Sequence, residues 1–105
     1  MFRVRKSIPV DPDLQGYIYF VSRMYQKLDS KGQRRVRDLC AQAGGEYHKA
    51  LFEFVTTGAG TVAVCQKHYI SQSTLERIVR KYYIAFAKQY GKEGGGESGR
   101  IHIQD

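Results

Sequence analysis

Apolar residues recur three and four positions apart in successive segments of this 105-residue chain. That spacing places them on one face of an α-helix, whereas a half-buried strand alternates apolar and polar residues. The run Ile-His-Ile at 101–103 alternates like a strand but is too short to establish one, and no β-hairpin turn signal is present. The sequence therefore predicts an all-α protein, a compact bundle of about five helices with no β-wing.

Start and stop signals along the chain indicate where these helices begin and end. Asp11 followed by Pro12 is typical of a helix N-terminus. Ser30 and Gln33 match a capping box, in which the serine side chain accepts a hydrogen bond from the helix backbone. Gly91 is expected to end the last helix. The helices are expected over residues 12–28, 30–43, 46–56, 61–68 and 72–90.

The apolar face of each predicted helix indicates the core. Most aromatic residues fall on these faces, so core packing explains them better than stacking on single-stranded nucleic acid. The residues expected to be buried are Leu14, Tyr17, Ile18, Val21, Met24, Tyr25, Leu28, Val36, Leu39, Cys40, Ala43, Tyr47, Ala50, Leu51, Phe54, Val55, Val64, Cys65, Leu75, Ile78, Val79, Tyr82 and Phe86.

The chain is long enough for one domain with a modest core. We expect a basic N-terminal arm over 1–10, a helical domain over 11–90 and a disordered glycine-rich tail over 91–105. No segment reaches the roughly 18 apolar residues that cross a bilayer, and the basic N-terminus lacks the apolar core of a signal peptide. The expected location is the cytoplasm.

Cys40 and Cys65 are the only cysteines in the sequence. Each falls on the apolar side of a predicted helix, which favours two reduced core thiols. His48 and His68 are the further donors that a zinc site would need. Structural zinc sites, however, use paired short spacings such as Cys-x-x-Cys, which this sequence lacks. No metal and no cofactor is therefore expected.

The sequence also gives no support for a nucleotide loop or a catalytic site. The segment 58–60, Gly-Ala-Gly, is not followed by Lys-Ser or Lys-Thr, and no strand precedes it. We expect this segment to connect two helices. No Ser-His-Asp set and no suitable pair of carboxylates can be assembled, so the protein is not expected to be an enzyme.

The formal net charge of +7 is concentrated in three blocks of the sequence. Residues 1–10, 29–45 and 71–90 hold the excess of Lys and Arg, while the two signs nearly cancel elsewhere. Such blocks favour a polyanion as partner, because Lys and Arg neutralise phosphates and release the counterions around them.

Residues 61–83 fit a short helix, a tight turn and a longer basic helix. Val64 takes a packing position in the short helix, and Cys65 is a small residue that permits close approach. Together with "YISQSTLERIVRKYY" at 69–83, the segment resembles the helix-turn-helix DNA-binding domains of bacterial and phage regulators, recombinases and transposases. Tyr69 stands where these domains often have glycine, so its backbone is expected either to avoid a positive φ or to accept strain.

The resemblance implies that the second helix enters the major groove of duplex DNA, with short polar residues at its N-terminal end. Gln72 and Ser73 would reach base edges, while Arg80 and Lys81 would contact the sugar-phosphate backbone. The DNA-binding residues expected on this basis are Ser71, Gln72, Ser73, Thr74, Arg77, Arg80 and Lys81. Because one short domain contacts only a few base pairs, a homodimer on a two-fold site is expected. The implied role is that of a small transcriptional regulator or an accessory factor of a mobile element.

Two other basic groups are candidates for further DNA contacts. One lies in the N-terminal arm, which would follow a minor groove, and the other on the outer face of the second predicted helix. These candidate residues are Arg3, Arg5, Lys6, Arg34, Arg35 and Arg37.

A protein partner is the alternative to DNA. In size and charge the chain is similar to small helical proteins of phages and mobile elements that bind and inhibit a host protein such as a defence nuclease. Some of these proteins also bind DNA. Nothing in the residues separates this hypothesis from the first.

Overall fold

The structure, a computed structural model, describes residues 4–93, and all regular structure in this range is helical. This confirms the prediction of an all-α protein. In the described range, no helix is long and apolar enough to span a membrane. The helices are α1 (Pro12–Arg23), α2 (Ser30–Gly44), α3 (His48–Thr57), α4 (Thr61–His68) and α5 (Gln72–Glu93), with 3-10 turns at Tyr25–Lys27 and Gly45–Tyr47.

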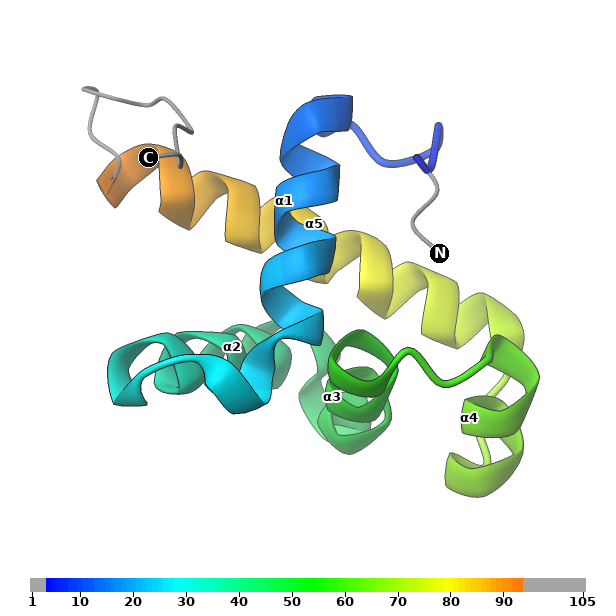
Figure 1. Ribbon diagram of the computed structural model, residues 1–105. Helices are drawn as coiled ribbons and strands as arrows, with labels where there is room; N and C mark the ends of the chain where they lie inside the picture. Colours follow the sequence, from blue (N-terminus) through cyan, green and yellow to red (C-terminus); the bar gives the residue numbers. More distant parts are fainter. Residues whose placement is uncertain (1–3, 94–105) are drawn as a thin grey trace.

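Helix α5 forms the centre of the fold, because it contacts each of the other α-helices. Figure 1 shows α1 crossing α5, while α2, α3 and α4 follow one another in a row beside it. The face of α5 that meets these helices was predicted from its spacing and is buried. Since each large apolar side chain contributes roughly 1.5–3 kcal/mol when buried, this face supplies much of the core. It consists of Leu75, Ile78, Val79, Tyr82 and Phe86.

The first helix is shorter than predicted. α1 ends at residue 23, and the chain continues as the 3-10 turn Tyr25–Lys27. The side-chain amide of Gln33 donates to the Tyr25 carbonyl oxygen at 3.0 Å, so this oxygen is satisfied without a longer α1. The turn redirects the chain. As a result Tyr25 is buried as predicted, whereas Met24, also predicted to be buried, is 50% exposed.

Helix α2 begins with a different cap from the one predicted. Asp29 Oδ1 accepts from the Gly32 N–H at 2.8 Å, so Asp29 is the N-cap and Ser30 is the first helical residue. The carboxylate both accepts this bond and complements the positive end of the helix dipole. At the other end, Gly45 has a φ of +56°. Glycine adopts this conformation without steric penalty.

Two further helix boundaries differ from those expected. α3 begins at His48, after the 3-10 turn Gly45–Tyr47. α5 continues through Gly91 to Glu93, because a glycine costs a helix only about 1 kcal/mol and does not force it to end. From residue 94 on, the predicted tail lies outside the described residues.

The N-terminal segment 4–10 is held against α1 by Gln15, a polar residue that is only 1% exposed. Gln15 Oε1 accepts from the Arg5 N–H at 2.9 Å. Its Nε2 lies 3.1, 3.3 and 3.0 Å from the carbonyl oxygens of Arg5, Ile8 and Val10. One buried amide thus satisfies backbone groups that have no helix or strand to pair with. The described part of the predicted arm therefore packs on the domain.

Candidate nucleic-acid interface

Residues 69–71 connect α4 to α5. α4 ends at His68. The next residue, Tyr69, has a left-handed backbone (φ 55°, ψ 48°), and the Ile70 N–H donates to the Cys65 carbonyl at 3.1 Å. This is a Schellman-type helix end, in which the position of Tyr69 is usually glycine. For a residue with a Cβ, this conformation costs roughly 1–2 kcal/mol. Tyr69 therefore accepts the strain. Its side chain is 93% exposed, so packing within the domain does not compensate for it.

Ser71 caps the N-terminus of α5. Its Oγ accepts from the Thr74 N–H at 3.1 Å and lies 2.9 Å from Thr74 Oγ1 and 3.2 Å from Ser73 Oγ. A hydroxyl with three such partners has no remaining capacity for an external ligand. Thr74 is half-buried, whereas Gln72 and Ser73 are exposed. Of the four polar residues predicted here as DNA contacts, Gln72 and Ser73 are thus the two best placed for one.

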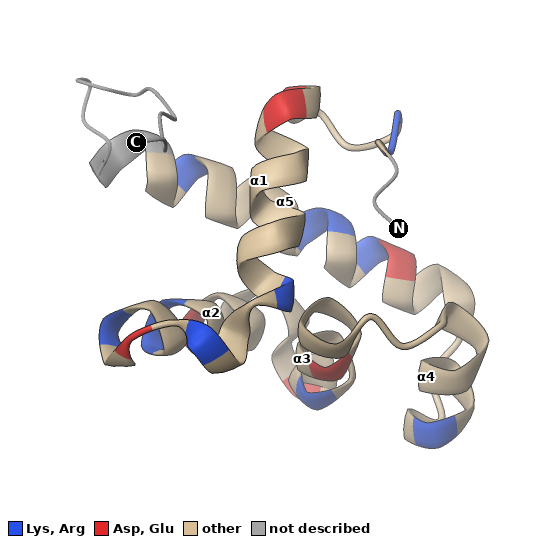
Figure 2. Cartoon of the chain, viewed as in Figure 1, with Lys and Arg blue, Asp and Glu red and all other residues tan. Residues whose placement is uncertain are grey.

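The exposed side of α5 carries four residues that we call the α5 row: Ser73, Glu76, Arg77 and Arg80. They are three or four positions apart, so they follow one side of the helix, opposite its buried face. With an advance of 1.5 Å per residue the row is about 10 Å long. Neither arginine of the row makes a salt bridge within residues 4–93. Figure 2 shows basic positions along α5 and one acidic position nearer its start.

Lys81 follows the α5 row but is turned about 100° from Arg80. It lines a shallow groove between α2 and α5 with Gln42, Ala43 and Lys88. The structure therefore places Lys81 beside the row and not in it. This position suits contact with a neighbouring phosphate better than contact with a base.

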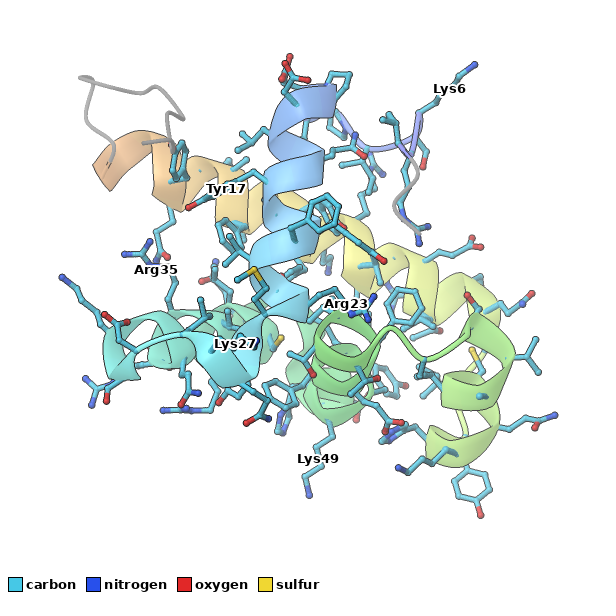
Figure 3. The ribbon with its side chains drawn as sticks, viewed as in Figure 1. Lys6, Tyr17, Arg23, Lys27, Arg35 and Lys49 are labelled. Atoms are coloured by element: carbon cyan, nitrogen blue, oxygen red, sulfur yellow. The ribbon has the colours of Figure 1, made fainter. Side chains whose placement is uncertain are left out.

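The described part of the predicted arm, which includes Arg5 and Lys6, does not extend from the domain as a free chain. Arg3 lies outside the described residues. The guanidinium of Arg5 lies 6.0 Å from the centre of the Phe54 ring, at cation–π distance. Lys6 is exposed, and Figure 3 shows its side chain pointing away from the helices. Lys6 therefore remains directed toward solvent.

The arginines of α2 form a separate surface. Arg37 Nη1 donates to the Tyr25 hydroxyl at 2.8 Å. This hydrogen bond holds the Arg37 guanidinium against the 3-10 turn beside α2. Arg34 is exposed and Arg35 is half-buried. Figure 1 shows α2 and α4 on opposite sides of α3. The structure does not bring this group together with the α5 row.

A charged cluster beside the turn was not predicted. Glu53 Oε1 on α3 lies 2.9 Å from His68 Nε2 and 3.1 Å from Lys67 Nζ, both at the C-terminal end of α4. The hydrogen bonds to His68 and to Lys67 lower the pKa of the Glu53 carboxyl. This cluster ties the end of α4 to α3 and so helps to hold the turn that precedes the α5 row. Lys67 and His68 follow Glu53 by 14 and 15 residues in the sequence. Helical periodicity relates residues within one helix and therefore could not predict this cluster.

The two cysteines are unpaired, and they differ in burial. Cys40 is buried, and burial raises the pKa of its thiol to about 12. Cys65 is half-buried and packs at the edge of the core. Within residues 4–93 no three His, Cys, Asp or Glu side chains are grouped so that they could hold a metal ion.

Comparison of the chain with protein-family models, curated proteins and solved structures gives no match. The interpretation of this surface therefore rests on its own residues and geometry.

Proposed function

We propose that the protein binds duplex DNA through α4, residues 69–71 and α5, acting together as a helix-turn-helix, with α5 in the major groove. The observation that carries this proposal is the α5 row. It presents a polar and basic edge directly opposite the buried face of the same helix. A helix that enters a groove needs this division between one face in the core and one face toward the bases.

The dimensions and chemistry of the α5 row suit the major groove. A length of about 10 Å spans roughly three base pairs, and the groove is wide enough for an α-helix. Ser73 is able to donate to or accept from a base edge, and Arg77 is able to form a two-pronged contact with guanine. Gln72, on the flank of the row, has the amide geometry that pairs with adenine. Lys81 would neutralise a phosphate and fix the register.

A homodimer on a two-fold site belongs to the same proposal. A single row that covers roughly three base pairs gives little selectivity among the many competing sites of a genome. Two copies, one helical turn of DNA apart, would double the sequence that is read. A small transcriptional regulator, or an accessory factor of a mobile element, is the role that this mode of binding supports.

Fluorescence anisotropy with random duplexes and with the duplex upstream of the coding sequence tests the proposal. Titrations at about 50 and 200 mM salt should give a slope of log affinity on log salt near −0.9 per phosphate contact, for roughly five to seven contacts. Arg77→Ala and Gln72→Ala should each lower affinity for a preferred site by about 1–3 kcal/mol. Lys88→Ala, which removes an exposed cation about 12 Å beyond Arg80 along α5, serves as the control. No salt-dependent binding to any duplex would overturn the proposal.

A second candidate, binding and inhibition of a host protein such as a defence nuclease, is favoured by the apolar surface of α4 and the turn. Val62 and Tyr69 are both exposed, and Tyr69 is held there at a cost in backbone strain. Strained and exposed aromatic residues are typical of contact sites. A plasmid-interference assay with a defence nuclease distinguishes the two functions. A protein-directed inhibitor protects the plasmid, loses protection on Tyr69→Ala and keeps it on Arg77→Ala.

A further inference from the structure

A cavity of 340 Å³ lies beside the N-terminus of α4, apart from the α5 row. Its size falls within the range of about 300–1,000 Å³ that is usual for small-molecule pockets. Six parts of the chain form its wall: the N-terminal segment, α1, α3, the connector 58–60, the first residue of α4, and α5. The residues on which the argument depends are Arg5, Tyr19, Phe54, Thr61 and Tyr83.

Arg5 lines this cavity, and Arg23 lies against its lining residue Tyr19; neither arginine has a carboxylate partner. Arg5 lies in its wall over the Phe54 ring, and Arg23 lies 5.7 Å from the centre of the Tyr19 ring, to whose hydroxyl it donates at 2.9 Å. No Asp or Glu lines the cavity, and neither arginine is ion-paired within the described range. Stacking on a ring covers one face of a guanidinium and leaves its N–H edge available to an anion.

Gly58 lets Arg23 approach the connector. A Cβ at this position would lie 2.6 Å from Arg23 Cζ, and the φ of +76° also favours glycine. Figure 3 shows Arg23 directed toward the region where α1, α3 and the connector meet. The Gly-Ala-Gly segment therefore lets a cation lie against Gly58 in the connector that precedes α4, although the segment lacks the motif of a nucleotide loop.

Two kinds of neutral donor face the same space. Helix α4 begins after Gly60 with no side-chain cap, so its first backbone N–H groups have no partner from a capping residue. Tyr83 lines the cavity and is only 6% exposed, and its hydroxyl makes no hydrogen bond within residues 4–93. Burial raises the pKa of Tyr83 to about 12, while the charge of nearby Arg5 acts in the opposite direction. The phenol is therefore protonated at neutral pH and able to donate.

We propose that this cavity binds a small organic anion with a flat apolar body, of the aryl carboxylate or aryl phosphate class. The anionic group would be held by Arg5, the Tyr83 hydroxyl and the N-terminus of α4, with the ring between Tyr19 and Phe54. The aromatic walls distinguish such a ligand from a phosphate of DNA, which would need only the cations and the backbone amides. The inference goes beyond DNA binding and does not depend on it.

Calorimetric titration of the full chain, without DNA, tests this inference with phenyl phosphate, benzoate, inorganic phosphate and benzamide. We expect phenyl phosphate or benzoate to bind with a Kd of about 1 mM or below. Inorganic phosphate lacks the ring and benzamide lacks the charge, so each should bind at least about tenfold more weakly. Equal binding of phenyl phosphate and inorganic phosphate would overturn the inference, as would no binding of either aryl anion at about 10 mM.

Variants locate the site. Arg5→Gln should weaken binding of the aryl anion by about tenfold or more, whereas Lys88→Gln, the same charge change outside the cavity, should leave it unchanged. Tyr83→Phe should weaken binding several-fold without lowering the melting temperature, because the hydroxyl makes no bond within the described protein. If Arg5→Gln fails to fold, the affinity of Tyr83→Phe for the aryl anion becomes the test of the site. Unchanged aryl-anion affinity in Tyr83→Phe would then overturn the assignment.

Discussion

The Tyr82 hydroxyl lies 2.7 Å from Ser22 Oγ, and this hydrogen bond joins the middle of α5 to the last turn of α1. Ser22 Oγ also donates its only proton to the Ile18 carbonyl at 2.7 Å, so the tyrosine is the donor of the pair. Both side chains are fully buried. Burial raises the pKa of Tyr82, because a phenolate there would lack water. A directional polar contact thus fixes how α1 crosses α5.

We expect Tyr82→Phe to lower the free energy of unfolding by about 1–2 kcal/mol, because it leaves Ser22 with an unsatisfied lone pair inside the core. Ser22→Ala should cost a similar amount. The double variant should cost less than the sum of the two, since both changes remove the same bond. Urea denaturation measures these values, with the exposed Tyr69→Phe as control. Strictly additive losses would contradict the coupling.

Gln15 offers a second test, because one side chain anchors the whole N-terminal segment. We expect Gln15→Leu to lower the free energy of unfolding by about 2–3 kcal/mol, since several buried hydrogen bonds are lost at once. Segment 4–10 should then detach. Trypsin cleavage after Arg5 and Lys6, followed by mass spectrometry, should become faster than in the wild type and in the exposed-site control Gln42→Leu. Equal cleavage rates would show that Gln15 is not the anchor.

Helical spacing predicted the apolar core well but could not identify its polar members. Leu39, Val64 and Leu75 are buried as expected, because each repeats at three or four residues within one helix. Gln15 and Ser22 are equally buried, yet a polar residue gives no periodic signal. Their burial depends on partners supplied by other segments. Met24 fits the apolar pattern of α1 but is exposed, since the helix ends before it.

The left-handed backbone at Tyr69 predicts a substitution that stabilises the protein, in contrast to the variants of Tyr82, Ser22 and Gln15. We expect Tyr69→Gly to raise the free energy of unfolding by about 0.5–1 kcal/mol, because relief of the Cβ strain outweighs the greater freedom of glycine in the unfolded chain. The ring is exposed, so its loss from the folded state costs little. Thermal unfolding measures the change, and Tyr69→Phe separates the ring hydroxyl from the backbone effect. A less stable glycine variant would contradict the argument.

The cluster of Glu53, Lys67 and His68 predicts how stability depends on pH. Since the pKa of Glu53 is lowered in the folded state, its contribution is present above the unfolded value of about 4.3 and is lost as pH falls through the folded value. Glu53→Gln should therefore be less stable than the wild type at pH 7, by a small amount because the ion pairs lie at the protein surface. The difference should shrink as pH falls below the unfolded value and vanish once the carboxyl is protonated in both states. A difference that does not change with pH would contradict the electrostatic explanation.

The candidate interface was more predictable than the cavity for a geometric reason. The α5 row lies within one helix, so the spacing of Ser73, Glu76 and Arg80 is enough to place them on one side. The cavity, by contrast, brings Arg5 and Tyr83 together from segments almost eighty residues apart in a 105-residue chain. Only the packing of α1, α3 and α5 creates that proximity.

Glu76 supplies the last prediction, because it places a carboxylate within the basic α5 row. A carboxylate repels phosphates but accepts a hydrogen bond from the amino group of cytosine. We expect Glu76→Gln to raise affinity for random duplexes several-fold and to reduce the preference for a selected site by about 1–3 kcal/mol. Anisotropy titrations on both kinds of duplex measure the two effects. Glu46→Gln, the same charge change at an exposed position outside α5, should alter neither the affinity for random duplexes nor the preference. If Glu76→Gln and Glu46→Gln behave alike, α5 does not face the DNA.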